Sequence, residues 1–314
     1  MTRSLAFLVL AHDDIEHLLR LTQRLAPHPV YAHVDAKSPA DLTALRECGN
    51  LQLIEPRIAV HWAEFSVVSA TLALITASLS NGGAQHTVLL SGHCYPIRPV
   101  EALTEWLSAH PNNDFIQMVR IGPGSAINNN VGRHWRNAPL LPDRLLCLPS
   151  VAKCERLGRR IYNRVAREFP RDIYRELAPH SLFQGSQWWA LTAESLTEIM
   201  AIVLREPRWQ KVFRTTHAPD ELFFHTILGS SKRYGNQIGS TVDYGHENLY
   251  DAPLHYVART VDRWLTNDHE QRQKVLHSDK FFVRKIGSRH RSLLDWIDGQ
   301  VTGNAALPKY GTSR

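Results

Sequence analysis

The 314-residue sequence predicts an α/β protein with a mostly parallel sheet and helices on both of its faces. Two observations predict this class. Strand-like runs alternate with helix-like runs through the first half of the chain, which is the order that parallel crossover units require. The strand-like runs, such as LAFLVLAH at 5–12 and HTVLLSG at 86–92, are almost continuously apolar, as expected for strands that are buried on both faces.

The separate elements follow from apolar spacing and from residues that break helices. Residues 65–79 have the composition of a largely buried helix, which ends before Asn81, Gly82 and Gly83. The expected strands are 5–12, 29–35, 51–56, 86–92, 114–119, 186–192 and 281–285. The expected helices are 15–26, 65–79, 100–110, 154–169 and 193–206.

The composition, with 43% hydrophobic and 21% charged residues, is that of a folded domain. We expect one domain over residues 1–299, with a basic helical insertion at about 133–180 and a fraying tail at 300–314. The four scattered cysteines, Cys48, Cys94, Cys147 and Cys154, match no zinc or disulfide pattern and are expected to be reduced thiols.

No window approaches eighteen uncharged apolar residues, so no transmembrane span is expected. The N-terminal apolar run is superficially like a signal peptide, but it lacks a small-residue cleavage site and is better explained as a first buried strand. The expected location is cytoplasmic, and peripheral contact with the inner face of the membrane is a further hypothesis.

A basic segment at 133–175 carries eleven lysines and arginines against four acids. Within it, Leu157, Ile161, Val165 and Phe169 recur at every fourth residue, which indicates an amphipathic helix. A solvated charged face is the simplest interpretation. Attraction to anionic lipid or to a lipid-linked acceptor comes next. Nucleic-acid binding is the least favoured, because no recognised nucleic-acid module accompanies the charge.

The stretch HAPDELFFHTIL at 217–228 places two adjacent carboxylates, Asp220 and Glu221, between a proline and an apolar, helix-like run. Acidic side chains are favoured in a first helical turn, so two capping carboxylates are the simplest interpretation. The alternative interpretation is a catalytic carboxylate.

Other short strings favour the second interpretation: HVD at 33–35, SGHCYPIRP at 91–99, GSQWWALT at 185–192 and FVRK at 282–285. Together with Pro-Asp-Glu, their order resembles that of the core-2/I-branching β1,6-N-acetylglucosaminyltransferases and the related peptide O-xylosyltransferases. The resemblance implies a bacterial-type catalytic domain of GT-A-like fold. It also implies inverting, metal-independent transfer from a UDP-sugar, with Glu221 as the catalytic base.

The resemblance also implies a donor site. Lys285 matches the diphosphate-binding lysine, Arg284 precedes it, and Arg259 or Arg263 matches a partner arginine, although basic residues at the end of a strand also serve as edge protection. Asp35 is expected to accept a hydrogen bond from uracil or ribose, with His33 packed beside it. The alternative for Asp35 is a cap on the segment that follows.

No metal or other cofactor is expected. The sequence contains no Asp-x-Asp, no HExxH and no tight His/Cys cluster. If the leaving group is anionic, side-chain cations must therefore stabilise it.

The expected cleft around donor and acceptor also includes Trp62, Ser91, Gly92, Tyr95, Ser186, Gln187, Trp188, Trp189 and Asp220. Two adjacent tryptophans on a strand would point to opposite faces, one of them toward the cleft, where a ring can stack on a sugar. The expected partners are a UDP-sugar and a glycan or glycoconjugate acceptor, with no nucleic acid.

Two positions depart from the family's pattern, because Cys94 stands where an aspartate is usual and Ala63 where a glycine is usual. These departures favour one alternative, a saccharide- or nucleotide-binding protein without turnover. N-acetylglucosamine is the favoured sugar, and xylose is the alternative within the family.

Overall fold

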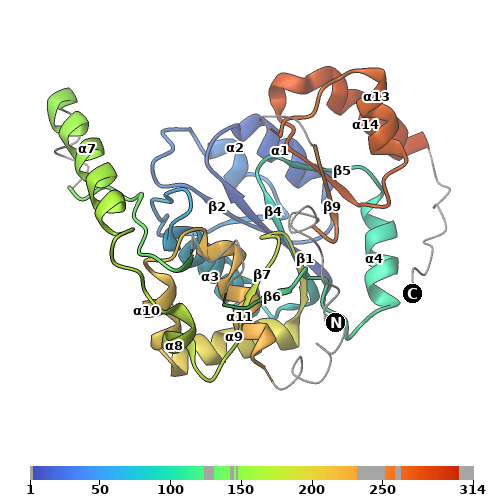
Figure 1. Cartoon of the computed structure of the whole chain (residues 1–314). Helices are drawn as coiled ribbons and strands as arrows, with labels where there is room; N and C mark the ends of the chain where they lie inside the picture. Colours follow the sequence, from blue (N-terminus) through green and yellow to red (C-terminus); the bar gives the residue numbers. More distant parts are fainter. Residues whose placement is uncertain are drawn as a thin grey trace.

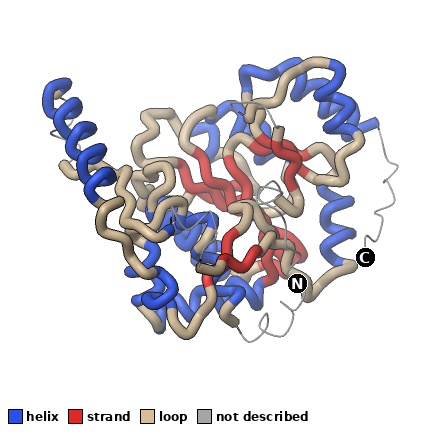
Figure 2. Tube along the Cα trace, viewed as in Figure 1, coloured by secondary structure: helices blue, strands red, loops and turns tan. Residues whose placement is uncertain are grey.

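A five-stranded sheet forms the centre of the computed structural model, which describes residues 3–123, 131–141, 145, 148–231, 252–258 and 263–303 (Figures 1 and 2). Its strand order is β3-β2-β1-β4-β8. The first four strands in this order are parallel, and β8 runs antiparallel to β4 at one edge. Their bounds are β1 Arg3–Ala11, β2 Val30–Val34, β3 Leu51–Leu53, β4 Ala84–Ser91 and β8 Ala190–Thr192. The predicted fold class is confirmed, and the arrangement is consistent with a GT-A-like fold.

Both faces of the sheet are buried, because alternate residues of β1 point into two separate apolar clusters. Leu5, Phe7 and Val9 belong to the first cluster, whereas Ala6 and Leu8 belong to the second. Side chains of α1, α4 and α14 complete the first cluster, and side chains of α3, α9 and α11 complete the second. The continuous apolar runs of the sequence therefore arise from burial on two sides.

The helices connect these strands and extend the chain beyond the sheet. The α-helices are α1 Ile15–Arg24, α2 Thr43–Arg46, α3 Phe65–Ser80, α4 Val100–Ser108, α7 Pro149–Val165, α8 Ile173–Leu177, α9 Ala193–Arg205, α10 Arg208–Phe213, α11 Phe223–Gly229, α13 His269–Leu276 and α14 Arg291–Gly303. Two short 3-10 helices are η1 Pro219–Glu221 and η4 Ser288–His290.

Two smaller sheets bring distant motifs together. Strand β10 (Phe282–Arg284) pairs with β5 (Cys94–Pro96) on one side and with β9 (His255–Val257) on the other. The FVRK string therefore lies beside SGHCYP, nearly 190 residues away in the sequence. Strands β6 (Val119–Ile121) and β7 (Leu182–Gln184) form the second small sheet. Strands of three residues, such as β5, β7 and β9, are too short to show a periodicity, and the sequence did not predict them.

Two strand predictions were wrong in extent. Residues 114–119 form only a bridge from Phe115 to Ala190, and β6 begins at Val119. In the predicted strand 186–192, only Ala190–Thr192 is a strand, because the backbone N–H of Ser186 donates to the Gln117 side chain instead of to a neighbouring strand. Trp188 and Trp189 therefore precede the strand.

The predicted basic helix exists as α7, and Figure 1 shows it extending away from the body of the molecule. No helix in the described part of the chain is long and apolar enough to cross a membrane. Cys48, Cys94 and Cys154 are free thiols, and Cys147 lies outside the described residues. The predicted boundary at residue 299 falls within α14, and the tail from residue 304 is also outside the described residues.

Candidate active site

The Pro-Asp-Glu segment is held by backbone hydrogen bonds to two loops that are distant in sequence. The N–H of Ala218 donates to the carbonyl of Ala63 at 3.2 Å, and the N–H of Gly185 donates to the carbonyl of Glu221 at 3.0 Å. Ala63 and Ala218 both have left-handed backbone conformations, with φ of 58° and 47°. The glycine that the family's pattern has at position 63 suits this conformation, and an L-residue adopts it at a cost of about 1–2 kcal/mol.

Gly185 is required by a close approach of two backbones. A Cβ atom at this position would lie 1.8 Å from the carbonyl oxygen of Gln117. The glycine of the GSQWW string therefore allows the chain after β7 to pass close enough to bind the backbone of Glu221.

Neither carboxylate caps a helix, so the simplest interpretation from the sequence was wrong. Helix α11 has Leu222 as its N-cap and no side-chain capping hydrogen bond. The Oδ1 atom of Asp220 is buried and has no hydrogen-bond partner among the described residues. Glu221 Oε2 accepts a hydrogen bond of 3.3 Å from the Gln184 side chain, a contact that the sequence did not predict.

Burial raises the pKa of Glu221 to about 7, and the neighbouring charge of Asp220 adds to the effect. Burial likewise raises the pKa of Asp220 to about 6. Two adjacent carboxyl groups in a poorly hydrated site resist double ionisation. The raised pKa brings Glu221 closer to neutral pH, and a general base is most efficient when its pKa lies near the working pH.

Arg284 and Arg263 oppose this effect, because the positive charge of each lowers the pKa of Glu221. The guanidinium of Arg284 lies 4.4 Å from the centre of the Trp188 ring, and its Nε donates to Ser91 Oγ at 3.0 Å. Arg263 accepts a backbone hydrogen bond of 2.9 Å from the N–H of Lys285, so the Arg263 and Lys285 segments are adjacent. Arg259, the competing match, lies outside the described residues.

Cys94 is fully buried at the start of β5, and burial raises the pKa of its thiol, which is therefore neutral at physiological pH. Its Sγ lies 3.3 Å from Ser91 Oγ, the atom to which Arg284 donates. An aspartate at this position would place a carboxylate beside Arg284. The charge of Arg284 also lowers the pKa of Asp220 and of Glu221.

The ring of Trp264 lies near several basic side chains, including that of Lys285. The sequence did not predict this role. Arg289 lies 3.8 Å from the centre of its ring, and Lys285 Nζ lies 5.9 Å away. The rings of His93 and His290 also contact it. A tryptophan face stabilises nearby cations, so this cluster concentrates positive charge beside the Lys285 segment. The tryptophan five residues after the string HYVAR was the available signal.

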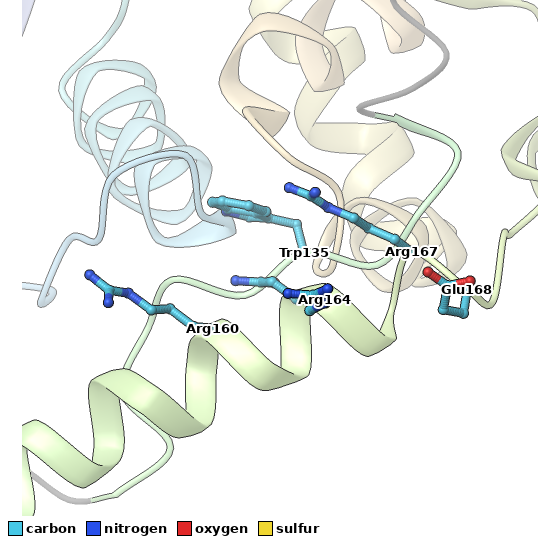
Figure 3. Close-up of a pocket in the computed structure, with 6 residues that line it drawn as sticks. Trp135, Arg160, Arg164, Arg167 and Glu168 are labelled. Carbon is cyan, nitrogen blue, oxygen red and sulfur yellow. The ribbon is translucent and has the colours of Figure 1, made fainter.

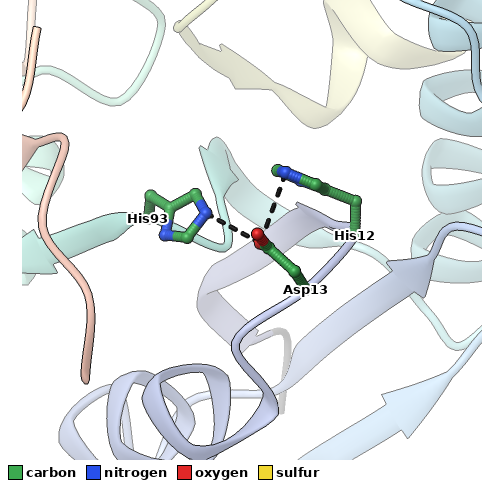
Figure 4. Close-up of side chains that lie close together, drawn as sticks. All are labelled: His12, Asp13 and His93. Atoms are coloured by element: carbon green, nitrogen blue, oxygen red, sulfur yellow. Dashed lines mark hydrogen bonds and ion pairs between the residues drawn. The ribbon is translucent and has the colours of Figure 1, made fainter. Parts of the chain in front are cut away.

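His12, Asp13 and His93 form the group of potential metal ligands within the described part of the chain (Figure 4). Asp13 Oδ1 lies 2.8 Å from His93 Nε2 and 3.3 Å from His12 Nε2. The sequence contains no tight His/Cys cluster, and this group forms only in space. The missed signal is that His12 and Asp13 follow β1 while His93 follows β4, and the carboxyl ends of neighbouring parallel strands meet.

An aromatic group flanks the carboxylates on another side. Trp62 is 72% exposed, and the centre of its ring lies 5.7 Å from the centre of the His217 ring. The ring centre of Trp135 lies 4.7 Å from that of His217. Trp135 also lines an open pocket with Arg160, Asn163, Arg164, Arg167 and Glu168 (Figure 3). The exposed Trp62 ring thus lies close to the Pro-Asp-Glu segment, as the sequence predicted.

Asp35 and His33, which were predicted to contact the donor, make hydrogen bonds to the loop of residues 58–60. Asp35 Oδ1 accepts from the N–H of Lys37 and of Val60, and Oδ2 accepts from Lys37 Nζ at 2.9 Å. These hydrogen bonds hold the pKa of Asp35 below its usual value, although burial opposes them. The ring of His33 is buried and accepts from the N–H of Ile58. The alternative of a capping aspartate fits this geometry.

Several predicted cleft residues are buried and already bonded. The hydroxyl of Tyr95 donates to Asp298 and accepts from Arg20, so it faces α1 and α14 instead of the site. Ser186 Oγ accepts from the N–H of Trp188, which is buried under Arg284. Trp189 is fully buried, and Gly92 is packed closely against Ala11. Gln187 is half-buried.

The comparisons with known proteins agree with this geometry. Residues 5–133 match the model of the Core-2/I-Branching enzyme family. Over this part, the chain is similar to the core-2/I-branching enzymes. This similarity implies glycosyltransferase activity, with a nucleotide-sugar donor and a glycan acceptor. A comparison with curated proteins finds no match. The resemblance expected from the motifs is therefore confirmed for the part of the fold that carries β1 to β6.

The raised pKa of Glu221 predicts a pH-dependent stability. In the unfolded chain a glutamate titrates near 4.3, whereas in the folded protein Glu221 titrates at about 7. The folded state therefore binds the extra proton, and this contribution to stability is present at low pH and is lost as pH rises through about 7. The substitution Glu221→Gln should raise the free energy of unfolding at pH 8 by about 2 kcal/mol and change it little at pH 4.5.

Thermal unfolding of both proteins at the two pH values measures this difference, with Glu198→Gln on α9 as the control. An equal effect of Glu221→Gln at both pH values would contradict the assignment of the raised pKa.

Proposed function

We propose that this protein is a metal-independent, inverting glycosyltransferase that moves a sugar from a UDP-sugar to a hydroxyl of a glycan acceptor. The observation that carries the proposal is Glu221, a carboxylate with a pKa raised to about 7 that lies within the electrostatic reach of Arg284 and Arg263. N-acetylglucosamine is the favoured sugar in this proposal, and xylose is the alternative.

Glu221 acts as the general base in this proposal. A sugar hydroxyl is a weak nucleophile until it loses its proton, and a positioned carboxylate that accepts the proton contributes about 10²–10⁴-fold to the rate. The acceptor oxygen attacks the anomeric carbon as its proton moves to Glu221, and the bond to the UDP oxygen breaks on the opposite face. An α-linked donor therefore gives a β-linked product.

Fixed cations stabilise the leaving diphosphate in the same proposal. Lys285 and Arg263 belong to adjacent segments, and the charges of Arg263 and Arg284 both act on Glu221. Guanidinium groups can bind phosphate oxygens in a bidentate manner, and charged donors in a poorly hydrated site stabilise a developing negative charge. These residues occupy the role that a divalent cation has in transferases with an Asp-x-Asp motif.

The exposed ring of Trp62 supports an acceptor site beside Glu221. It contacts His217, which lies four residues before the carboxylate, and an exposed tryptophan can pack against the apolar face of a sugar. The basic pocket beside Trp135 continues from the same aromatic group. The acceptor is accordingly proposed to be a glycan or glycoconjugate that spans from Glu221 toward Trp135.

A binding protein without turnover is the alternative, and Cys94 is the observation that favours it. Its thiol replaces the carboxylate that the family usually has at this position. Glu221, Gln184 and the cations favour turnover, because a purely binding protein has no need for a destabilising carboxylate pair in its recess.

The first test separates catalysis from donor binding. Glu221→Gln should lower transfer at least 100-fold and leave the affinity for UDP within about twofold, because the base contacts the acceptor proton and not the diphosphate. Lys285→Ala should weaken UDP binding instead. Transfer is followed by product formation from a panel of UDP-sugars, and binding by a thermal-shift titration with UDP. Persistent transfer by the Glu221→Gln protein, together with weakened UDP binding, would exclude the assigned role of Glu221.

The second test concerns the metal. Transfer should be unchanged in EDTA, because side-chain cations carry the leaving-group charge. The His12, Asp13 and His93 cluster provides the control, since it is the group among the described residues that could hold a divalent cation. If EDTA abolishes transfer, Mn²⁺ restores it, and His12→Ala prevents the restoration, then the reaction depends on a metal at this cluster and the proposal of metal independence is wrong.

A further inference from the structure

Helix α7 presents two neighbouring rows of exposed side chains. The apolar row consists of Leu157, Ile161 and Val165, and these residues are 56%, 54% and 50% exposed. The basic row consists of Arg156, Arg160 and Arg164, all of which are exposed. Residues four positions apart lie on one side of a helix, so the rows run side by side along α7.

The opposite side of α7 is attached to the rest of the chain. Glu155 is buried, accepts from the N–H of Leu140 at 3.0 Å and pairs with Arg159. Asn163 exchanges two hydrogen bonds with the backbone of Arg136. These contacts fix which side of the helix faces outward, so the exposure of the apolar row follows from the way the helix is anchored.

Two further exposed apolar side chains lie near the ends of the helix. Phe169, which follows the helix, is 68% exposed, and Leu148, its N-cap, is 53% exposed. Isolated exposed apolar residues are common on soluble proteins, but a continuous exposed apolar patch marks an interaction surface.

The charge of the basic row indicates which kind of partner binds the exposed side of α7. Within the described part of the chain, no acidic side chain forms an ion pair with Arg156, Arg160 or Arg164. Figure 3 shows Arg160 and Arg164 on α7, with Arg167 just beyond its end. An apolar row bordered by cations is complementary to a lipid bilayer with anionic headgroups, because the apolar side chains enter the interface while the cations contact phosphates. A second copy of the same helix would bring two basic rows together and is disfavoured.

We propose that α7 docks this protein on an anionic membrane surface through the apolar row and the basic row. The helix is attached to the segment that also carries Trp135, which contacts His217. Docking would therefore hold the aromatic side of the site near the membrane surface. The proposal does not depend on the transferase activity.

Vesicle sedimentation of the full chain tests it. The protein should bind vesicles of phosphatidylcholine mixed with phosphatidylglycerol, and bind vesicles of phosphatidylcholine alone much more weakly. Binding should fall as salt rises from 0.1 M to 1 M, over which the screening length shrinks from about 10 Å to about 3 Å. Equal binding to both kinds of vesicle, or binding to neither, would overturn the proposal.

Variants locate the surface. Ile161→Glu should weaken binding by about tenfold or more, as expected when an apolar contact is replaced by a repelled charge. Replacing Arg156, Arg160 and Arg164 together by glutamine should weaken it about 100-fold.

The matched controls carry the same changes elsewhere on the surface. Leu204→Glu alters a residue of α9 that is 76% exposed, and the joint glutamine replacement of Arg205, Lys211 and Arg214 removes three exposed cations. Both controls should bind vesicles like the parent. Circular dichroism melts establish that every variant is folded. Equal losses in the controls and the α7 variants would contradict docking through α7, and so would a parent dimer that Ile161→Glu dissociates without any change in vesicle binding.

Discussion

The electrostatic balance around Glu221 is the interaction on which the account of this site depends. Burial and the neighbouring Asp220 push its pKa upward, whereas Arg284 and Arg263 pull it down. Without the arginines the carboxylate would stay protonated at neutral pH, and without burial it would be a weak base. The balance gives a group that can accept a proton at physiological pH and that destabilises the folded protein when it is ionised.

This balance is assembled from segments that are distant in the sequence. Backbone hydrogen bonds from Ala218 to Ala63 and from Gly185 to Glu221 fix the position of the carboxylates. The pairing of β10 with β5 places Arg284 beside Ser91. Ser91 ends β4 and Ala63 follows β3, so both belong to the carboxyl ends of parallel strands, where ligands bind in such sheets. Substitutions in the anchoring loops, such as at Gly185, should therefore disturb the site without touching a ligand.

The sequence predicted the fold class and the long elements because their apolar patterns are strong. The strand of residues 5–12 and the helix of residues 65–79 correspond to β1 and α3. The order of short motifs also predicted one site for Glu221, Arg284 and Lys285, and in the structure the charge of Arg284 acts on Glu221. The sequence could not show that Asp35 and His33 hold a loop, since the hydrogen bonds to Val60 and Ile58 depend on the packing of distant segments.

Other features required the structure for a similar reason. Gln184 lies on a strand of three residues with no periodicity of its own, and its contact with Glu221 arises only when β7 and η1 meet. The His12, Asp13 and His93 cluster forms because two parallel strands end side by side. The amphipathic pattern of α7 was visible in the sequence, but which side of the helix faces outward was decided by Glu155 and Asn163.

A direct titration of the Glu221 carboxyl group is the most direct test of this account. Infrared spectra of the protonated-carboxyl band, recorded as a function of pH for the parent and the Glu221→Gln protein, isolate the signal of this group by difference. The account predicts a difference band that disappears with a midpoint near pH 7. A midpoint below pH 5 would show that Glu221 is an ordinary, hydrated carboxylate and would contradict the proposed general base.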